Sequence, residues 1–173
     1  MDRDQYLGLL SEGYRLAFER GDLSAGADKY AEALRALAPG ELAHSMHHGE
    51  YAAILWKLGR KDEAVAQSRS ALDAAIGESV GDPDPIEVAI QRYFLAEQLL
   101  GVGRHGDALD VVTPSLGTKT NAAALLLMIQ AEALFALGRH PEAKAAAAEA
   151  MRRASPDQRA RMALRMGRLL GEL

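Results

Sequence analysis

The stretch Leu58-Gly-Arg-Lys-Asp-Glu-Ala64 decides the fold, because its pattern recurs along the chain. Each copy places a glycine between two runs of apolar residues that have helical spacing. Glycine readily takes the left-handed conformation that ends a helix, so each copy predicts a turn between two helices. The other copies are Arg20-Gly-Asp-Leu-Ser-Ala-Gly26, Val102-Gly-Arg-His-Gly-Asp-Ala108 and Leu137-Gly-Arg-His-Pro-Glu-Ala143, and the turn glycines are Gly21, Gly59, Gly103 and Gly138.

Small residues recur at fixed distances from the turn glycines. Small side chains at such spacings let neighbouring helices pack closely. Five residues after the glycines stand Gly26, Ala64, Ala108 and Ala143, and twelve residues after them stand Ala33, Ala71, Ser115 and Ala150. Seven residues before the last three glycines stand Ala52, Ala96 and Ala131, whereas the first repeat has Tyr14 in that place.

The apolar periodicity predicts nine helices, at about 2–20, 24–37, 41–58, 61–76, 85–101, 105–116, 121–137, 141–154 and 156–171. Proline is favoured at the first position of a helix, and Pro85, Pro141 and Pro156 are expected there. Ser155 and Gln158 are expected to form a capping box. The expected N-caps are Asp84, His140 and Ser155.

This pattern resembles the tetratricopeptide repeat (TPR), a 34-residue unit with small residues at its positions 8, 20 and 27. The resemblance implies an all-α fold, an α-solenoid of four helix-turn-helix (TPR-like) repeats plus a C-terminal capping helix. We expect a single TPR-like domain over 1–173, with repeats at about 3–38, 41–76, 85–117 and 120–154 and the capping helix at 156–171. The turn glycines are 38, 44 and 35 residues apart, so the first two repeats are longer than the standard unit, with an insertion expected at 77–84.

The last helix is amphipathic. Its apolar stripe is Met162, Met166, Leu169, Leu170 and Leu173, and its polar stripe is Arg161, Arg165, Arg168 and Glu172. A solenoid end exposes an apolar edge, and a helix with one polar face can cover it. Two other roles for this helix are alternatives to capping. It would be a dimerisation helix, which would make a homodimer possible, or a basic helix that lies on a membrane surface.

Composition narrows the class of protein. The chain has no cysteine, an acidic N-terminus and no uninterrupted apolar stretch of the length that a membrane span requires, so we expect a soluble cytoplasmic protein without a membrane span. The net charge of −4 argues against nucleic-acid binding, although residues 151–173 are locally basic. Fifteen Arg against five Lys, with abundant Ala, fits a GC-rich bacterial gene.

Three motifs suggest chemistry, but their contexts favour structural roles. Gly101-Val-Gly-Arg-His-Gly106 matches a dinucleotide-binding pattern, but it follows a helical segment and no strand is predicted. His44 and His48 could bind a metal if Glu41 joined them; a solvated helix face that also carries His47 is the favoured interpretation. The two prolines and two aspartates of 82–85 lack the ligand set of a calcium loop. We therefore expect no catalytic residues, metal or cofactor, and no enzyme.

The TPR resemblance also implies a binding surface. In TPR proteins the first helix of each repeat lines a concave groove, where aromatic anchors and a few charges hold a peptide. Carrying these positions over gives Glu12, Arg15, Phe18, Met46, Trp56, Lys57, Tyr93, Glu97, Met128, Glu132 and Phe135. For Met128 and Phe135 the alternative interpretation is that their side chains pack in the core instead of facing the groove. Co-chaperone members of the family bind a C-terminal carboxylate with a clamp of Lys, Asn and Arg side chains. This clamp is missing here, because the corresponding positions hold Glu12, Arg15, Glu50, Ile90 and Phe94.

The function implied by this resemblance is that of a protein–protein interaction scaffold or adaptor. It would bind a peptide or a partner helix, of unknown identity, in the groove. The alternative is a regulatory or homo-oligomerisation module that acts through the basic amphipathic C-terminal helix.

Overall fold

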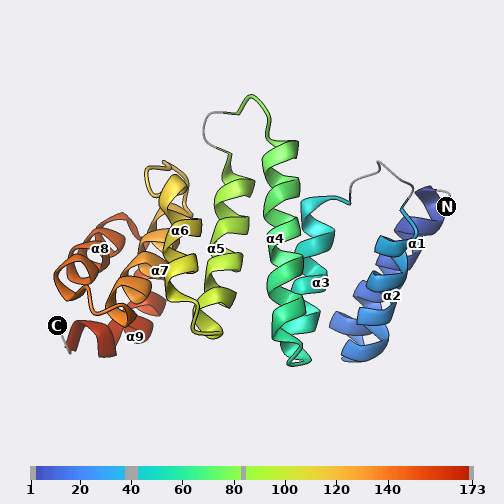
Figure 1. Cartoon of the computed structure of the whole chain (residues 1–173), viewed down its shortest axis with the longest axis horizontal. Coiled ribbons are helices and arrows are strands. Elements are labelled where there is room, and N and C mark those ends of the chain that lie inside the picture. The colour runs from blue at the N-terminus through green and yellow to red at the C-terminus, as the bar shows by residue number, and fades with distance from the viewer. Residues whose placement is uncertain (1–2, 38–42, 83–84, 172–173) are drawn as a thin grey trace. The chain divides into compact units, whose positions relative to one another are not determined.

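The computed structural model describes residues 3–37, 43–82 and 85–171, which contain nine α-helices and no strand (Figure 1). The predicted all-α class is confirmed. The chain divides into two compact units, unit 1 (Met1–Glu78) and unit 2 (Ser79–Leu173). The elements are α1 (Arg3–Tyr14), a π-helical turn η1 (Arg15–Glu19), α2 (Leu23–Arg35), α3 (Ser45–Lys57), α4 (Lys61–Glu78), α5 (Ile86–Gly101), α6 (His105–Val112), a 3-10 turn η2 (Thr113–Ser115), α7 (Ala123–Ala136), α8 (His140–Arg153) and α9 (Pro156–Gly171).

The turn glycines end the first helix of each hairpin, as predicted. Gly59 has a φ of 76°, in the left-handed region that favours glycine. Its N–H donates to Trp56 O at 3.1 Å, and the N–H of Arg60 donates to Leu55 O at 3.0 Å, which is a Schellman motif. The same pair of hydrogen bonds recurs around Gly103 and Gly138, so three of the four turns have one geometry.

The arginine after three of the glycines has a repeated structural role. Arg60 binds Glu63 through two hydrogen bonds of 2.7 Å, and its carbonyl accepts from the N–H of Ala64 in the first turn of α4. Arg104 with Asp107 and Arg139 with Glu142 form equivalent ion pairs. All three pairs are exposed, so solvent screens them and they add little to stability. The recurring Gly-Arg dipeptide therefore marks the helix junction.

The predicted small residues lie in the hairpin contacts. Ala52, Ala96 and Ala131 are buried on the first helices, and Ala64, Ala108 and Ala143 are fully buried on the second helices. Ser115 differs, because α6 ends at Val112 and Pro114 lies in the 3-10 turn that follows. The helix predicted to reach 116 is therefore shorter, and Ser115 is only partly buried.

In the first repeat the small position is Gly13, not Tyr14. The π-helical turn η1 inserts one extra residue. The N–H of Asp22 therefore donates to Leu16 O, six residues back, whereas the equivalent hydrogen bond after Gly59, from Arg60 N–H to Leu55 O, spans five residues. Gly13 is buried, and a Cβ built on it would lie 2.9 Å from Tyr30 Cδ2. The extra residue shifts the register and turns Tyr14 outward.

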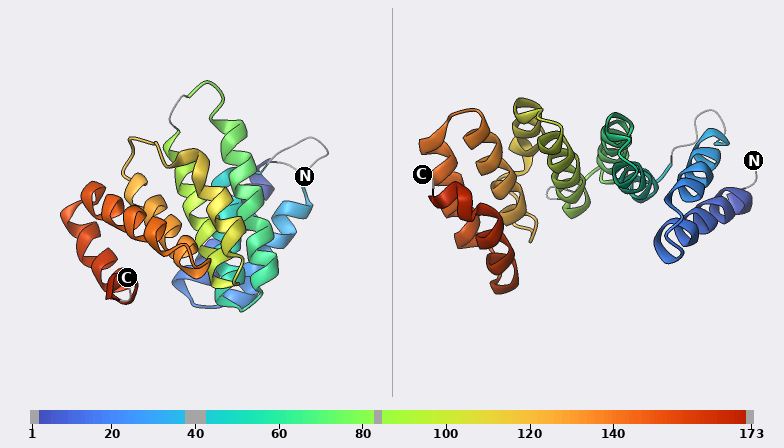
Figure 2. Two further views of the ribbon diagram at one scale, coloured as in Figure 1. Left: turned by 60° about the vertical axis from the view of Figure 1, so that its left-hand side comes forward. Right: turned by 90° about the horizontal axis from the view of Figure 1, so that it is seen from below.

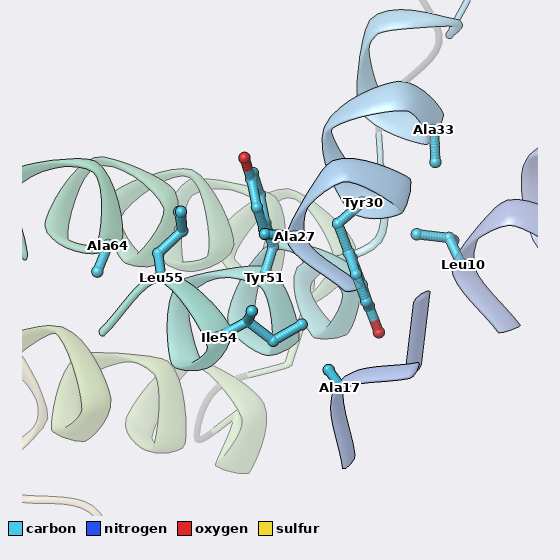
Figure 3. Packing of buried hydrophobic residues seen from close by; sticks show 9 residues of the cluster. All are labelled: Leu10, Ala17, Ala27, Tyr30, Ala33, Tyr51, Ile54, Leu55 and Ala64. Atoms are coloured by element: carbon cyan, nitrogen blue, oxygen red, sulfur yellow. The ribbon is translucent and has the colours of Figure 1, made fainter. Parts of the chain in front are cut away.

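Unit 1 has a core centred on Tyr30 of α2. Its ring lies between Leu10 of α1 and Ile54 of α3 and stacks on Tyr51, with ring centroids 6.0 Å apart (Figure 3). The Tyr30 hydroxyl donates to Glu50 Oε2 at 2.7 Å, and burial together with this carboxylate raises the pKa of Tyr30. The α1–α2 hairpin therefore packs on α3 through one fully buried aromatic ring.

Several expected helix starts are shifted. The helix expected at 41 begins at Ser45, because His44 is its N-cap and accepts from the N–H of Met46 at 3.4 Å; 38–42 lie outside the described residues. Pro85 precedes α5 as an extended N-cap, and the expected cap Asp84 also lies outside those residues. Arg139, not His140, precedes α8. At the insertion expected in 77–84, α4 continues to Glu78 and a turn follows at Gly81.

The capping box of the last helix is confirmed. Ser155 N donates to Gln158 Oε1 at 3.0 Å, and Gln158 N donates to Ser155 Oγ at 3.3 Å. The helix that follows, α9, packs against α7 and α8 (Figure 2) and buries Met162 and Met166, as its apolar stripe predicts. The remaining members of that stripe, Leu169, Leu170 and Leu173, have side chains outside the described residues.

The almost wholly apolar α7 lies at the centre of unit 2. It packs against α5, α6, α8 and α9. A helix with neighbours on all sides needs apolar residues around its whole circumference, which accounts for the composition of Ala123–Ala136. Within 3–37, 43–82 and 85–171, no helix combines the length and apolarity that a membrane crossing requires.

Candidate functional site

Unit 1 carries an exposed aromatic surface on the first helices of its two hairpins. We name Tyr14, Phe18 and Lys57 the aromatic patch. The Tyr14 and Phe18 rings lie with centroids 4.9 Å apart, and Lys57 Nζ lies 5.1 Å from the Phe18 centroid, within cation–π distance. Tyr14 is 45% exposed and Phe18 is 36% exposed. Phe18 and Lys57 were predicted groove residues, whereas Tyr14 was not.

The sequence already contained a signal that the Tyr14 side chain faces outward. The small residue before the turn stands eight places ahead of Gly21, at Gly13, and seven places ahead of the other glycines. An offset of one residue indicates an inserted residue in the first helix, and π-helical turns supply one. The insertion exchanges the buried and exposed positions, and Tyr14 joins Phe18 at the surface.

The other predicted groove residues of unit 1 divide between surface and packing. Met46 is 52% exposed in the first turn of α3, and Arg15 is exposed on η1. Glu12 is bound to Lys29 of α2 at 3.4 Å. Trp56 packs partly against the unit 1 core, and Lys61 Nζ lies 5.3 Å from its ring. Trp56 therefore lies at the border between core and surface.

In unit 2 three predicted groove residues meet a residue of the last helix. Arg165 Nε and Nη2 donate to the Glu132 carboxylate oxygens at 2.6 and 2.9 Å, and Arg165 Nη1 donates to Glu97 Oε1. The Tyr93 hydroxyl donates to the same Glu97 oxygen at 3.1 Å. We name Tyr93, Glu97, Glu132 and Arg165 the Arg165 cluster. It joins α5, α7 and α9.

Burial and charge act together in the Arg165 cluster. Burial, and secondarily the Glu97 carboxylate, raises the pKa of Tyr93 to about 12. Burial alone would lower the pKa of Arg165, but hydrogen bonds and charge from Glu132 and Glu97 raise it overall. A planar guanidinium that holds one carboxylate in bidentate fashion and touches a second is a specific geometry, which a lysine could not reproduce.

The two remaining groove residues, Met128 and Phe135, take part in packing. Met128 is buried, with 3% of its surface exposed. Phe135 is half-buried and packs edge-on against His140, with centroids 4.9 Å apart. A cavity of about 400 Å³ lies beside Met128; its lining is Tyr93, Leu125, Met128, Gln158, Arg161, Met162 and Arg165.

The histidines at the start of α3, His44 at its N-cap and His47 and His48 in its first turn, have different partners. His44 Nε2 lies 3.6 Å from Glu78 Oε2, while His47 Nδ1 lies 3.0 Å from the Tyr6 hydroxyl and His48 Nδ1 lies 2.8 Å from Gln67 Oε1. His47 and His48 are half-buried, so the expected solvated face is present only at His44, and burial lowers the pKa of His47. In the described part of the chain no three His, Asp or Glu side chains are arranged to hold a metal ion.

The hairpins, turns and small-residue contacts place the chain in the class of TPR-like helical repeat folds, an all-α solenoid. A solved structure shares this architecture: the apo form of RapI, itself a TPR-like helical repeat protein, superimposes with a TM-score of 0.71 at 14% sequence identity. The alignment covers 86% of this chain and 55% of the RapI chain, so this chain spans about half the length of RapI. At this identity the likeness establishes the fold alone.

Comparisons of the amino-acid sequence do not assign the chain to a family. No protein-family model matches the chain, and no curated protein sequence matches it significantly.

Proposed function

We propose that this protein is an interaction scaffold of the bacterial cytoplasm, which binds a segment of another protein on the first helices of its repeats and catalyses no reaction itself. The observation that carries the proposal is the exposed aromatic patch of Tyr14, Phe18 and Lys57. The TPR-like fold supports it, since such folds are interaction architectures.

The patch suits an extended or helical segment that carries an acidic or aromatic anchor. Rigid rings bury apolar area at little cost in side-chain entropy, and aromatic residues are enriched among binding hot spots. Lys57 adds a positive charge beside the ring, and two further predicted groove residues are exposed, Arg15 on η1 and Met46 in the first turn of α3. We propose that these residues contact the partner and that half-buried Trp56 reports its binding.

Affinity capture tests this proposal. The full-length chain and a Phe18→Ala, Lys57→Glu variant would be used as bait in extracts of the source organism, with mass spectrometry as the readout. Val80→Ala is the matched control, because Val80 is 87% exposed and lies outside the patch. We expect a partner that the wild type and the control retain and that the double variant loses.

A peptide from that partner gives the quantitative test. Titrating it into the full chain should change the fluorescence of Trp56, the only tryptophan. A partner whose affinity is the same for wild type, Phe18→Ala and Trp56→Ala would exclude this surface as the binding site.

Self-association through the last helix is the second candidate, and the packing of α9 speaks against it. Met162 and Met166 are already buried inside the chain, so this part of the apolar stripe is not available to a second copy. Light scattering of the full chain over a range of concentrations tests the point. A stable dimer that Leu164→Glu, on the exposed face of α9, disrupts would restore this candidate.

A further inference from the structure

The last helix occupies a site that is built to hold an arginine. Glu97 and Glu132 come from two different helices and stand at equivalent repeat positions, one residue after Ala96 and Ala131. Both carboxylates bind one guanidinium. Two carboxylates that share one cation repel each other in its absence, so a positive charge between them stabilises the site.

The geometry of the site selects arginine on a helix. The bidentate pair with Glu132 requires a planar fork, and the hydrogen bond from Tyr93 orients Glu97 toward the same point. The apolar residues that accompany Arg165 are Met162, three residues before it, and Met166, directly after it, and both are buried. An occupant therefore needs an arginine flanked by apolar residues on one helical face.

We propose that Tyr93, Glu97 and Glu132 form an acceptor site for the arginine of an amphipathic helix of a partner protein, and that α9 is the internal helix that this partner displaces. This inference rests on the proposed binding function and assigns a partner chemistry to its unit 2 surface. Arg165 blocks the site in the free protein. A tethered helix acts at a high effective concentration, so only a partner that supplies both the cation and the apolar contacts can displace it.

A peptide in trans tests the acceptor site on the full chain. The probe is a fluorescein-labelled peptide with the sequence of residues 155–173, and its binding is followed by anisotropy. Arg165→Gln weakens the internal helix without removing it. We expect the peptide to bind this variant at least about tenfold more tightly than the wild type, because the internal competitor has lost its bidentate contact.

Matched variants test whether the gain in peptide affinity arises at the acceptor site. Arg161→Gln lies one turn away on α9; Arg161 is exposed and makes no ion pair with the described residues, so this variant should bind the peptide as the wild type does. Arg165→Lys keeps the charge but not the fork and should give an intermediate affinity. Adding Glu132→Gln to Arg165→Gln should abolish the gain, and so should replacing the arginine of the peptide by glutamine.

Three different results would each overturn the proposal that a partner displaces α9. Equal peptide affinity for wild type and Arg165→Gln, with unchanged helical circular dichroism in both, would show that α9 only caps the fold. A gain that survives Glu97→Gln and Glu132→Gln would place the peptide elsewhere. A wild-type dimer that the peptide dissociates would mean exchange of α9 between two copies instead of a separate partner. Failure of this test leaves the capture experiment on Phe18 and Lys57 unaffected, because that surface lies in unit 1.

Discussion

Arg165 binds Glu132 with two hydrogen bonds, of 2.6 and 2.9 Å, across 33 residues of sequence. The contact fastens the last helix to the first helix of the fourth repeat. Arg165 also binds Glu97 of the third repeat, so one guanidinium links α9 to the first helices of two neighbouring repeats, a link that the repeat periodicity does not imply.

The Arg165 cluster should contribute modestly to stability. We expect Arg165→Gln to lower the free energy of unfolding by about 1 kcal/mol, because the group is half-buried and solvent screens part of the interaction. Thermal unfolding followed by circular dichroism measures the effect. Arg161→Gln is the control and should change stability by less than about 0.5 kcal/mol. An equal loss in both variants would mean that net charge, not the cluster, is responsible.

The close contact of the first hairpin predicts opposite effects for two glycine substitutions. A Cβ at Gly26 would lie 2.6 Å from the Cβ of Ala17 and 3.0 Å from the carbonyl oxygen of Gly13, so Gly26→Ala should destabilise by about 1–3 kcal/mol. Gly8 lies in α1 with open space around its Cβ position, so Gly8→Ala should stabilise by about 0.5–1 kcal/mol. Urea denaturation of both variants measures the difference, and the same sign for both would contradict the packing described here.

The Gly101–Gly106 motif offers a test of its structural interpretation. Gly103 has a φ of 78°, so Gly103→Ala should cost about 1 kcal/mol of stability. Gly106 lies in the first turn of α6 with open space around its Cβ position, and Gly106→Ala should be neutral or stabilising. Chemical denaturation would show the contrast. Nucleotide binding that either substitution abolished would instead support a phosphate-binding loop.

Stability should fall in the alkaline range as Tyr93 ionises. Burial raises the pKa of Tyr93 from 10.0 to about 12, so the folded state holds this proton more tightly than the unfolded state. The resulting stabilisation is complete below pH 10 and is lost as the pH rises from 10 toward 12. Tyr93→Phe should reduce the slope of the unfolding free energy against pH in this window. An unchanged slope would mean that other groups carry the alkaline dependence.

Much of the local architecture follows from the sequence. The turn glycines, the buried alanines and the Ser155–Gln158 capping box were all predictable, because helix termini and close helix contacts depend on residues within a few positions of one another. The helix limits differ by a few residues at 41–44, where His44 caps α3 from outside, and at 113–116, where Pro114 lies in a 3-10 turn.

The candidate binding surfaces depended on tertiary structure. The TPR resemblance implied Phe18 and Lys57 as groove residues, but the outward position of Tyr14 follows from a single inserted π-helical residue. Met128, Glu97 and Glu132 were predicted to face a groove, and in the structure Met128 is buried while both carboxylates bind Arg165. The equivalent repeat positions of Glu97 and Glu132, and an arginine on the last helix, were the only sequence signals of that cluster.

The sequence by itself determined that the chain forms helical hairpins, at which glycines they turn and which alanines pack between the paired helices, because these features rest on backbone conformation and side-chain size within one hairpin. Only the tertiary structure decided that α9 places Arg165 against Glu97, 68 residues away, and that Met128 is buried instead of facing a groove. The physical reason is that such contacts depend on the register in which whole helices pack, which no local spacing specifies.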